Sequence, residues 1–197
     1  ADTADVTGAK RTWIIDPLDG TRDYIRPDSR EWAVHVALCI DGALAAGAVC
    51  LPAFGVTYTT DPAPATPAPP PSPGGADSRP WRQVISRSRR VELARVVSAV
   101  LGTELLPVGS AGVKAMSVVS GGTDLYLHAG GMYEWDSAAP VAVAAAAGLW
   151  VSRMDGTPLR YLAPDPWLPD LLICHPRIAD DVLATVRAVL HSHRFLA

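Results

Sequence analysis

The chain has 197 residues, 49% of them hydrophobic, which is enough to bury a substantial core in one domain or in two small ones. Seventeen Lys and Arg stand against twenty Asp and Glu, for a formal charge of −3, and no basic run is present that would follow a nucleic-acid duplex. The composition therefore indicates a globular protein and argues against a role in binding duplex nucleic acid.

The three cysteines, Cys39, Cys50 and Cys174, lie far apart in apolar stretches, where a free thiol packs as a small hydrophobe. This usage is typical of a reducing cytosol. The longest apolar run, residues 141–151, is too short and too rich in Ala to span a bilayer. We therefore expect a cytoplasmic protein that has no membrane partner.

The first 60 residues predict an antiparallel sheet. A short polar lead over residues 1–11 runs into an apolar strand at 12–15, which ends at Asp16. Further strands are expected at 32–40, 43–51 and 56–60, with a hairpin signal at Asp41-Gly42.

Residues 61–80 contain eight Pro, with Gly74-Gly75 among them, so this stretch cannot pair in a sheet or continue a helix. We interpret it as a solvated loop or linker. The alternative is a polyproline ligand that recruits a partner domain, and the sparse charged residues speak against it.

Residues 81–197 alternate between strands and helices, which predicts an α/β arrangement. Strands are expected at 83–86, 104–108, 123–128, 150–153 and 170–174, and helices at 91–101, 111–119, 137–147 and 178–191.

The string Asp16-Pro17-Leu18-Asp19-Gly20-Thr21 carries the clearest chemistry. A turn of this kind lets the two carboxylates face one small volume, and the Leu18 carbonyl between them is a natural third oxygen donor for Mg²⁺. Gly20 and Thr21 are expected in the first turn of a helix, where free N–H groups favour a phosphate. The alternative is an ordinary turn capped by Asp19.

A second acidic candidate lies in Glu134-Trp135-Asp136-Ser137-Ala138-Ala139-Pro140. Here Asp136 is expected at the N-cap of an Ala-rich helix. Taken alone, Asp136 reads as a helix cap and nothing more, because Asp is among the commonest cap residues.

Together the two segments resemble the inositol monophosphatase family, lithium-sensitive phosphatases with a strand ending in Asp-Pro-hydrophobic-Asp-Gly-Thr and a later Trp-Asp-x-Ala-Ala. The order and spacing agree over nearly the whole chain, including Gly109-Ser110-Ala111-Gly112, residues 121–126 and Ala147-Gly148. The resemblance implies an αβαβα layered sandwich of the sugar-phosphatase type and an enzyme that hydrolyses phosphoric monoesters with two or three Mg²⁺ ions.

The resemblance also implies roles for the motif residues. Asp16 would bridge two metals, Leu18 would lend its carbonyl, and Asp19 and Asp136 would hold the second metal. Thr21 would help to orient the attacking water. Paired cations stabilise the attacking and leaving oxygens and lower the pKa of bound water.

Within the family, residues 109–114 and 126–131 are most similar to the CysQ-type 3'(2'),5'-bisphosphate nucleotidases. These enzymes remove the 3'-phosphate of adenosine 3',5'-bisphosphate, a by-product of sulfate assimilation. A cation near the Gly-Ser segment suits a ligand that carries a second phosphate.

On this interpretation Ser110 and Lys114 contact substrate, together with Asp19, Gly20 and Thr21. His128 and Arg160 are further candidates for the phosphate or the base. Each has a structural alternative: Ser110 caps the next helix, Lys114 is solvated on the helix surface, and His128 is a hydrogen-bonded residue at a strand end.

The chain also departs from the family pattern. Members carry a helical pair, an Asp-containing segment and a Glu-Glu pair ahead of the Asp16 strand, and one of those glutamates is a metal ligand. The sequence shown has none of these, so we expect residues 1–60 to form an incomplete N-terminal subdomain with one bare sheet face, joined by the 61–80 loop to the C-terminal subdomain of residues 81–197. On this expectation the chain alone is a fragment that is inactive and unstable.

Several functions remain open from the sequence. The leading one is a phosphatase acting on adenosine 3',5'-bisphosphate, working as a homodimer. Activity on inositol monophosphate, histidinol phosphate or fructose 1,6-bisphosphate is the nearest rival, because all use the same metal turn. A non-catalytic protein that binds a phosphorylated metabolite is an alternative of another class.

Overall fold

The computed structural model describes residues 10–71, 78–88 and 91–194, and the first stretch forms a four-stranded antiparallel sheet. Its strands, in spatial order, are β1 (Arg11–Asp19), β2 (Ala33–Ile40), β3 (Ala43–Leu51) and β4 (Val56–Thr59). Between β1 and β2 lies the short helix α1 (Thr21–Tyr24), and the 3-10 turn η1 (Pro52–Phe54) joins β3 to β4. The antiparallel sheet predicted for this region is confirmed.

The second sheet has five strands in the order β6-β5-β7-β9-β8. These are β5 (Arg82–Ser86), β6 (Glu104–Val108), β7 (Leu125–Tyr133), β8 (Trp150–Ser152) and β9 (Trp167–Cys174). Strands β6, β5 and β7 run parallel, and β9 and β8 continue the sheet in antiparallel pairs. The carboxyl ends of β5 and β6 therefore meet at one edge of this sheet.

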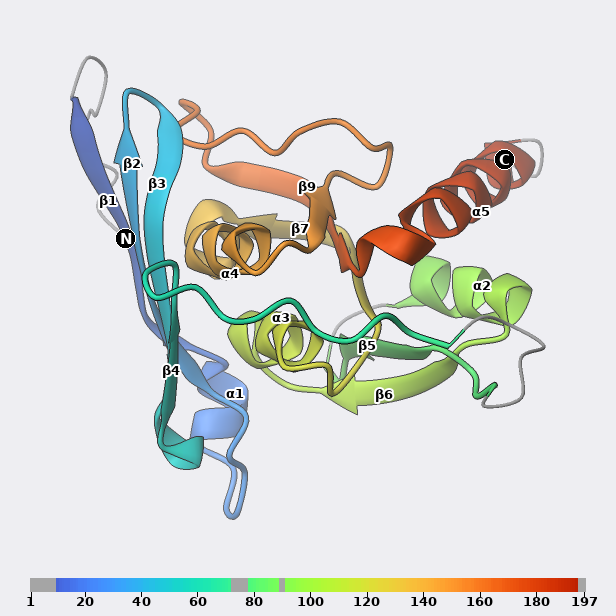
Figure 1. The fold of residues 1–197 in the computed structure, drawn as a ribbon, viewed down its shortest axis with the longest axis horizontal. Coiled ribbons are helices and arrows are strands. Elements are labelled where there is room, and N and C mark those ends of the chain that lie inside the picture. Colours follow the sequence, from blue (N-terminus) through green and yellow to red (C-terminus); the bar gives the residue numbers. More distant parts are fainter. Residues whose placement is uncertain (1–9, 72–77, 89–90, 195–197) are drawn as a thin grey trace.

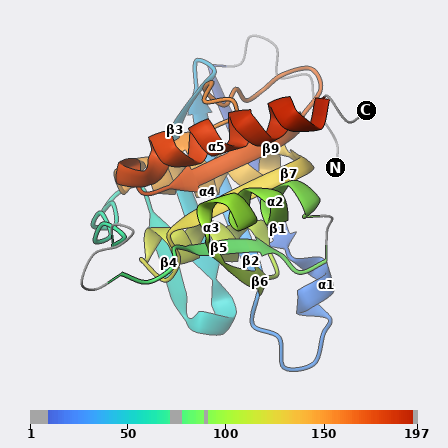
Figure 2. The same cartoon turned by 90° about the vertical axis from the view of Figure 1, so that its right-hand side faces the viewer.

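Four longer helices complete the layers. Helices α3 (Ala111–Val119) and α4 (Glu134–Ala146) lie between the two sheets, whereas α2 (Glu92–Leu101) and α5 (Pro176–Arg194) cover the far face of the second sheet (Figures 1 and 2). The described residues thus form sheet, helix, sheet and helix layers, and the predicted layered α/β sandwich is confirmed.

The composition of helix α4 suits its position between two sheets. It is apolar on nearly every side, with Ala138, Ala139 and Val143 buried, as expected of a helix with no solvent face. Strand β3 approaches it closely at Gly47, where an added Cβ would lie 2.8 Å from the Cβ of Ala142. The small residues on both elements allow α4 to reach the first sheet and to present its first turn beside β1.

The outer face of the first sheet is apolar and uncovered by the described residues. Alternation along β1 buries Ile14 and turns Trp13 and Ile15 outward, at 61% and 54% exposure. The bare face expected from the sequence is present in this part of the chain.

The Pro-rich stretch follows the surface of the molecule and forms no helix or strand over residues 61–71. It makes contact with the body, because Pro70 is buried and the indole N–H of Trp81 donates to the Pro71 carbonyl at 2.9 Å. The rest of the predicted loop includes residues 72–77, which lie outside the described residues. Within the described ranges, every helix is too short or too polar to cross a membrane.

Candidate metal and phosphate site

Strand β1 places two carboxylates on one face of the first sheet because its end is irregular. Residues three apart in a regular strand point to opposite faces, yet Asp16 and Asp19 are both buried, each at 8% exposure. The register with β2 shifts between them, from Asp16 opposite His35 to Asp19 opposite Ala33. The extra residue in β1 is a bulge, and it turns Asp19 to the same side as Asp16.

The third carboxylate comes from the start of helix α4. The prediction that Asp136 is the N-cap was wrong, because β7 continues to Tyr133 and the helix begins directly at Glu134. Asp136 is instead the third helical residue, and its carboxylate accepts a hydrogen bond from the Tyr133 N–H at 2.9 Å. One oxygen from each of Asp16, Asp19 and Asp136 lies within 4.8 Å of the other two.

This acidic cluster fits a hard divalent cation. Mg²⁺ takes oxygen ligands at about 2.0–2.1 Å, so two ligands of one ion lie at most about 4 Å apart, and the three carboxylate oxygens lie within 4.8 Å of one another. Burial raises the pKa of Asp16 above its ordinary value, and the charges of Asp19 and Asp136 raise it further, although the Leu18 N–H opposes them. A cation between the carboxylates would remove that mutual repulsion.

Two hydrogen bonds hold the Asp19 carboxylate, and the His35 ring lies beside it. The Ser110 hydroxyl and the Gly112 N–H both donate to its Oδ2, the latter at 2.8 Å, and Nε2 of His35 lies 3.5 Å from the same oxygen. Ser110 also caps helix α3, because its hydroxyl oxygen accepts the Val113 N–H at 3.1 Å. The predicted cap is therefore present, and the same hydroxyl ties α3 to the acidic cluster.

His35 is a site residue that sequence reasoning missed. The imidazole is fully buried, and its Nδ1 lies 3.1 Å from the Trp135 carbonyl, next to Asp136. Its ring also fills the space beside Gly112, where an added Cβ would lie 2.2 Å from Nε2. His35 thus contacts both halves of the acidic cluster, the β1 turn and the α4 start.

The turn between Asp16 and α1 is held by two hydrogen bonds between its own side chains and backbone. The Leu18 N–H donates to Asp16 at 3.0 Å, and the Thr21 hydroxyl donates to the Leu18 carbonyl at 3.3 Å. Gly20 is the N-cap with φ of 84°, and an added Cβ would lie 2.8 Å from the Glu31 carbonyl oxygen. Gly20 therefore precedes the helix predicted to include it, and that helix, α1, is only four residues long.

Lys114 is buried, at 4% exposure, so the alternative that it is solvated on the helix surface was wrong. Its ammonium donates to the carbonyls of Gly109 and Ser110, at 3.4 and 2.5 Å, and lies 5.4 Å from the centre of the Tyr126 ring. His128 lies in β7 with Nδ1 3.3 Å from the Tyr126 hydroxyl and Nε2 2.9 Å from the Gly131 carbonyl. Both side chains are therefore committed to internal contacts.

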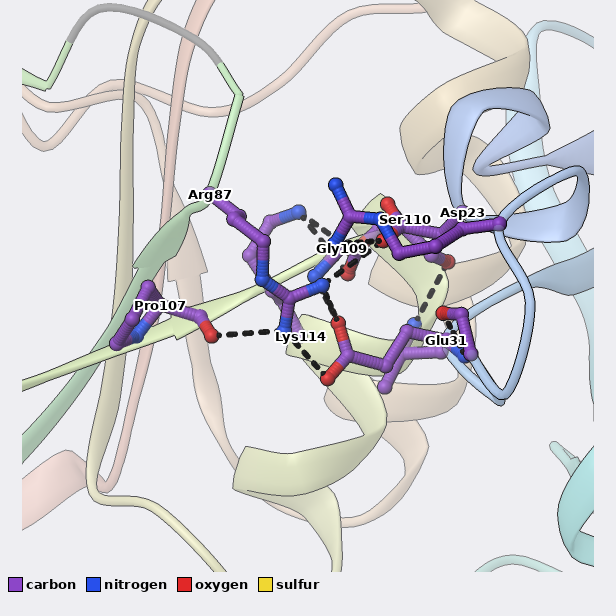
Figure 3. Close-up of polar contacts among 10 residues, drawn as sticks. Asp23, Glu31, Arg87, Pro107, Gly109, Ser110 and Lys114 are labelled. Atoms are coloured by element: carbon purple, nitrogen blue, oxygen red, sulfur yellow. Dashed lines mark hydrogen bonds and ion pairs between the residues drawn. The ribbon is translucent and has the colours of Figure 1, made fainter.

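A network of ion pairs supports the Gly109 turn from outside (Figure 3). Arg87, which follows β5, pairs with Asp23 of α1 at 2.8 Å and with Glu31 at 2.7 Å. The Glu31 carboxylate also accepts the Gly109 N–H. Burial opposes ionisation of Glu31, but the hydrogen bonds from Arg87 and Gly109 outweigh it and lower the pKa of Glu31. The network joins the two sheets next to the acidic cluster, and we call these residues, Asp23, Glu31 and Arg87, the brace.

The acidic cluster opens into a cavity of about 460 Å³ between the two sheets. Of the predicted site residues, its lining includes Asp16, Leu18, Asp19, Gly20, Thr21, Ser110, Lys114, His128 and Asp136. Arg22, Asp23, Ser86, Ser88 and Trp135 also line it. Arg160 instead lines a separate cavity with Leu44, Val141 and Tyr161, so the structure does not bring it to the acidic cluster.

The site residues that sequence reasoning missed have little local sequence pattern that would predict their role. His35 stands in an otherwise apolar strand, and a polar residue at a buried strand position is the one sign that it has a partner. The brace joins residues 56 and 64 positions apart, so the spacing of Arg87, Glu31 and Asp23 along the chain does not reveal it.

Comparison with known proteins shows the family to which the chain is related. The sequence pattern described as the inositol monophosphatase family matches residues 1–191. The chain is 44% identical over 182 residues to a protein from Mycobacterium bovis named 3'-phosphoadenosine 5'-phosphate phosphatase, covering 89% of this chain and 66% of the relative. It is 34% identical over 174 residues to the Escherichia coli protein named 3'(2'),5'-bisphosphate nucleotidase CysQ, covering 81% of this chain and 65% of that protein.

A solved structure shows the same fold. CysQ from Bacteroides thetaiotaomicron, titled a bacterial member of the inositol monophosphatase family, superposes with a TM-score of 0.67 at 26% identity, over 89% of this chain and 73% of that one. The chain spans about two thirds of the length of the curated relatives above. With the family pattern matching from residue 1 to residue 191, the chain belongs to the inositol monophosphatase family.

Proposed function

We propose that this chain carries the metal-binding and substrate-binding part of a Mg²⁺-dependent phosphomonoesterase that removes the 3'-phosphate of adenosine 3',5'-bisphosphate, giving AMP and phosphate. The observation that carries the proposal is the convergence of Asp16, Asp19 and Asp136 in one polar cavity. The names of the curated relatives support the nucleotide substrate over the sister substrates of the family.

Asp16, Asp19, Asp136 and the carbonyl of Leu18 would hold two or three Mg²⁺ ions. When bound, these ions would neutralise charge on the transferred phosphate and lower the pKa of water. The donor set is all oxygen, as Mg²⁺ requires, and it lies where the carboxylates otherwise repel one another.

The chain's own groups fix this arrangement before substrate arrives. Ser110 and Gly112 orient Asp19 through two hydrogen bonds, and the Thr21 hydroxyl is held against the Leu18 carbonyl. We assign Thr21 the orientation of the attacking water, and Gly20 and Thr21 contact with the transferred phosphate. Such preorganisation lowers the cost of assembling charged groups around the reacting centre.

The remaining candidate substrate residues differ in which cavity they line and in what they contact. Ser110 and His128 line the cavity and remain proposed contacts for substrate. Lys114 also lines it, but its bonds to the Gly109 and Ser110 carbonyls suit it to shaping that turn. Arg160 is left out of the proposed site because it lines the other cavity. We further propose a cytoplasmic homodimer, with lithium sensitivity and a place in sulfate assimilation.

Phosphate release from the full-length gene product tests the proposal. Adenosine 3',5'-bisphosphate, inositol monophosphate, histidinol phosphate and fructose 1,6-bisphosphate are compared with Mg²⁺ present, with and without Li⁺. We expect the highest kcat/KM on the bisphosphate nucleotide and inhibition by Li⁺. A higher kcat/KM on one of the other three would move the assignment to that sister activity. Binding of phosphorylated ligands with no release from any of the four would show a non-catalytic binding protein instead.

A further inference from the structure

The cavity that Arg160 lines differs in chemistry from the one that holds the acidic cluster. Its volume is about 490 Å³, which lies within the roughly 300–1,000 Å³ of small-molecule sites. Six of its nine lining residues are Ala, Leu, Val or Pro. Among the described residues that line it there is no Asp or Glu, and Arg160 is the one Lys or Arg. The cavity therefore suits neither a metal ion nor an organic cation.

Four separate parts of the chain form the walls. The end of the β2–β3 hairpin supplies Leu44, α4 supplies Val141, and β8 supplies Val151. The fourth wall is residues 158–161, in the segment between β8 and β9, which passes beside the hairpin end (Figure 1). Val141 is buried, whereas Leu44 and Val151 pack against the core and stay partly exposed. An apolar ligand would remove that remaining apolar surface from water, which favours its binding.

The fourth wall is held in place by the first turn of α4. The Tyr161 hydroxyl lies 3.2 Å from the Ser137 hydroxyl, and the Glu134 carboxylate accepts the Ala163 N–H at 3.2 Å. The Tyr161 hydroxyl is thus occupied on the side of α4, and its side chain lines the cavity. Sites for small molecules are usually formed before the ligand arrives, and these two contacts fix this wall in advance.

Arg160 carries the charge of the cavity without a partner of its own. It is exposed, and within the described ranges its side chain makes neither an ion pair nor a hydrogen bond, whereas Arg153 nearby in the chain pairs with Asp170 at 2.7 Å. A guanidinium presents paired N–H donors that match a carboxylate or a phosphate. One guanidinium balances one negative charge, so a phosphomonoester, with a charge of about −1.5 to −2 at pH 7, would keep excess charge beside apolar walls. A carboxylate is the better match.

We propose that this cavity is a second ligand site, which binds a small organic acid that has an apolar body and one carboxylate. The body lies between Leu44, Val141 and Val151, and the carboxylate pairs with Arg160. The site is separate from the acidic cluster, which lines the other cavity. The inference does not depend on the proposed function, since its test needs no turnover.

The test uses 2-naphthoate as the probe and 2-naphthamide as its uncharged match, with binding to the full-length protein measured by calorimetry. We expect 2-naphthoate to bind wild type with a dissociation constant of about 1 mM or tighter, an affinity within reach of a ligand of this size. Arg160→Ala should weaken 2-naphthoate about three- to tenfold, between the loss of an exposed ion pair and that of a charged hydrogen bond, and leave 2-naphthamide within about twofold. Arg95→Ala removes a positive charge from the exposed face of α2 and, as the matched control, should bind both probes as wild type does.

A second variant tests the apolar walls and leaves the charge in place. Ala43 is exposed at the start of β3 and lines the cavity, so Ala43→Phe should fill part of it and weaken both probes at least about threefold. Mg²⁺ with inorganic phosphate, directed to the acidic cluster, should not displace 2-naphthoate. The second site would be overturned by no binding of 2-naphthoate up to about 5 mM, by equal affinity in wild type and either Arg160→Ala or Ala43→Phe, or by displacement with Mg²⁺ and phosphate.

Discussion

The acidic cluster and the brace lie side by side. Both contain carboxylates, but the pKa values of Asp16 and Glu31 shift in opposite directions. In the cluster, Asp16 stands near Asp19 and Asp136, and burial with like charge raises its pKa. In the brace, Glu31 stands beside Arg87, and hydrogen bonding lowers its pKa despite burial. The difference separates a proposed metal site, whose negative charge a bound cation would compensate, from a support that is already paired with Arg87.

The Gly109–Lys114 segment connects the two regions. Gly109 donates its N–H to Glu31 of the brace, and Ser110 donates its hydroxyl to Asp19 of the cluster. Ser110 adopts a positive φ of 52°, an uncommon conformation for a residue with a side chain. The brace therefore holds the turn from which Ser110 orients Asp19, a proposed metal ligand.

The largest expected effect is in the cluster. Asp19→Asn keeps the shape of the side chain but removes one charge and one strong oxygen ligand, so we expect kcat to fall by at least about a hundredfold, a loss seen even for groups beyond the direct ligands. The measurement is the rate of phosphate release at saturating substrate over a Mg²⁺ titration. Asp180→Asn, on the exposed surface of α5, is the matched control and should match wild type. A rate for Asp19→Asn near that of the control would remove Asp19 from the site.

The second prediction concerns His35, which contacts Asp19 and the Trp135 carbonyl from within the first sheet. His35→Ala should raise the Mg²⁺ concentration for half-maximal activity about 10–100-fold, because the ligand loses a group that orients it. The KM for substrate at saturating Mg²⁺ should change much less. His35→Asn keeps a polar side chain at the site and should restore part of the metal affinity. A loss of kcat with unchanged Mg²⁺ dependence would show that His35 supports the fold and not the metal.

Sequence alone gives the acidic cluster because its residues lie in two short motifs, each with a local pattern. The motifs place Asp16 and Asp19 at a strand end and Asp136 at a helix start, although the helix begins three residues earlier than the cap pattern requires. Brace contacts join residues 56 to 78 positions apart, and no local pattern encodes them. Nor does the sequence around Lys114 reveal that this side chain is buried against the Gly109–Ser110 turn.

A smaller effect is expected in the brace, and it depends on pH. The folded pKa of Glu31 is below its ordinary value of 4.5, so ionised Glu31 stabilises the fold above that pH, and the contribution is lost as the pH falls through the folded pKa. Glu31→Gln should lower the free energy of unfolding by about 1–3 kcal/mol at pH 7. Denaturant unfolding of the full-length protein from pH 7 to pH 3 should show wild type and variant converging below pH 4.5. A constant difference over that range would mean that the Glu31 charge contributes nothing to the brace.

The most direct test of the central claim is a metal titration of phosphate release. The full-length protein is stripped of metal by a chelator, and adenosine 3',5'-bisphosphate is supplied while Mg²⁺ is added back to wild type and to Asp136→Asn. We predict no release without metal, full recovery of wild type with Mg²⁺, and no recovery of Asp136→Asn at the same concentrations. Full release by the metal-free wild type, or full recovery of Asp136→Asn, would contradict the assignment of Asp16, Asp19 and Asp136 as the metal site.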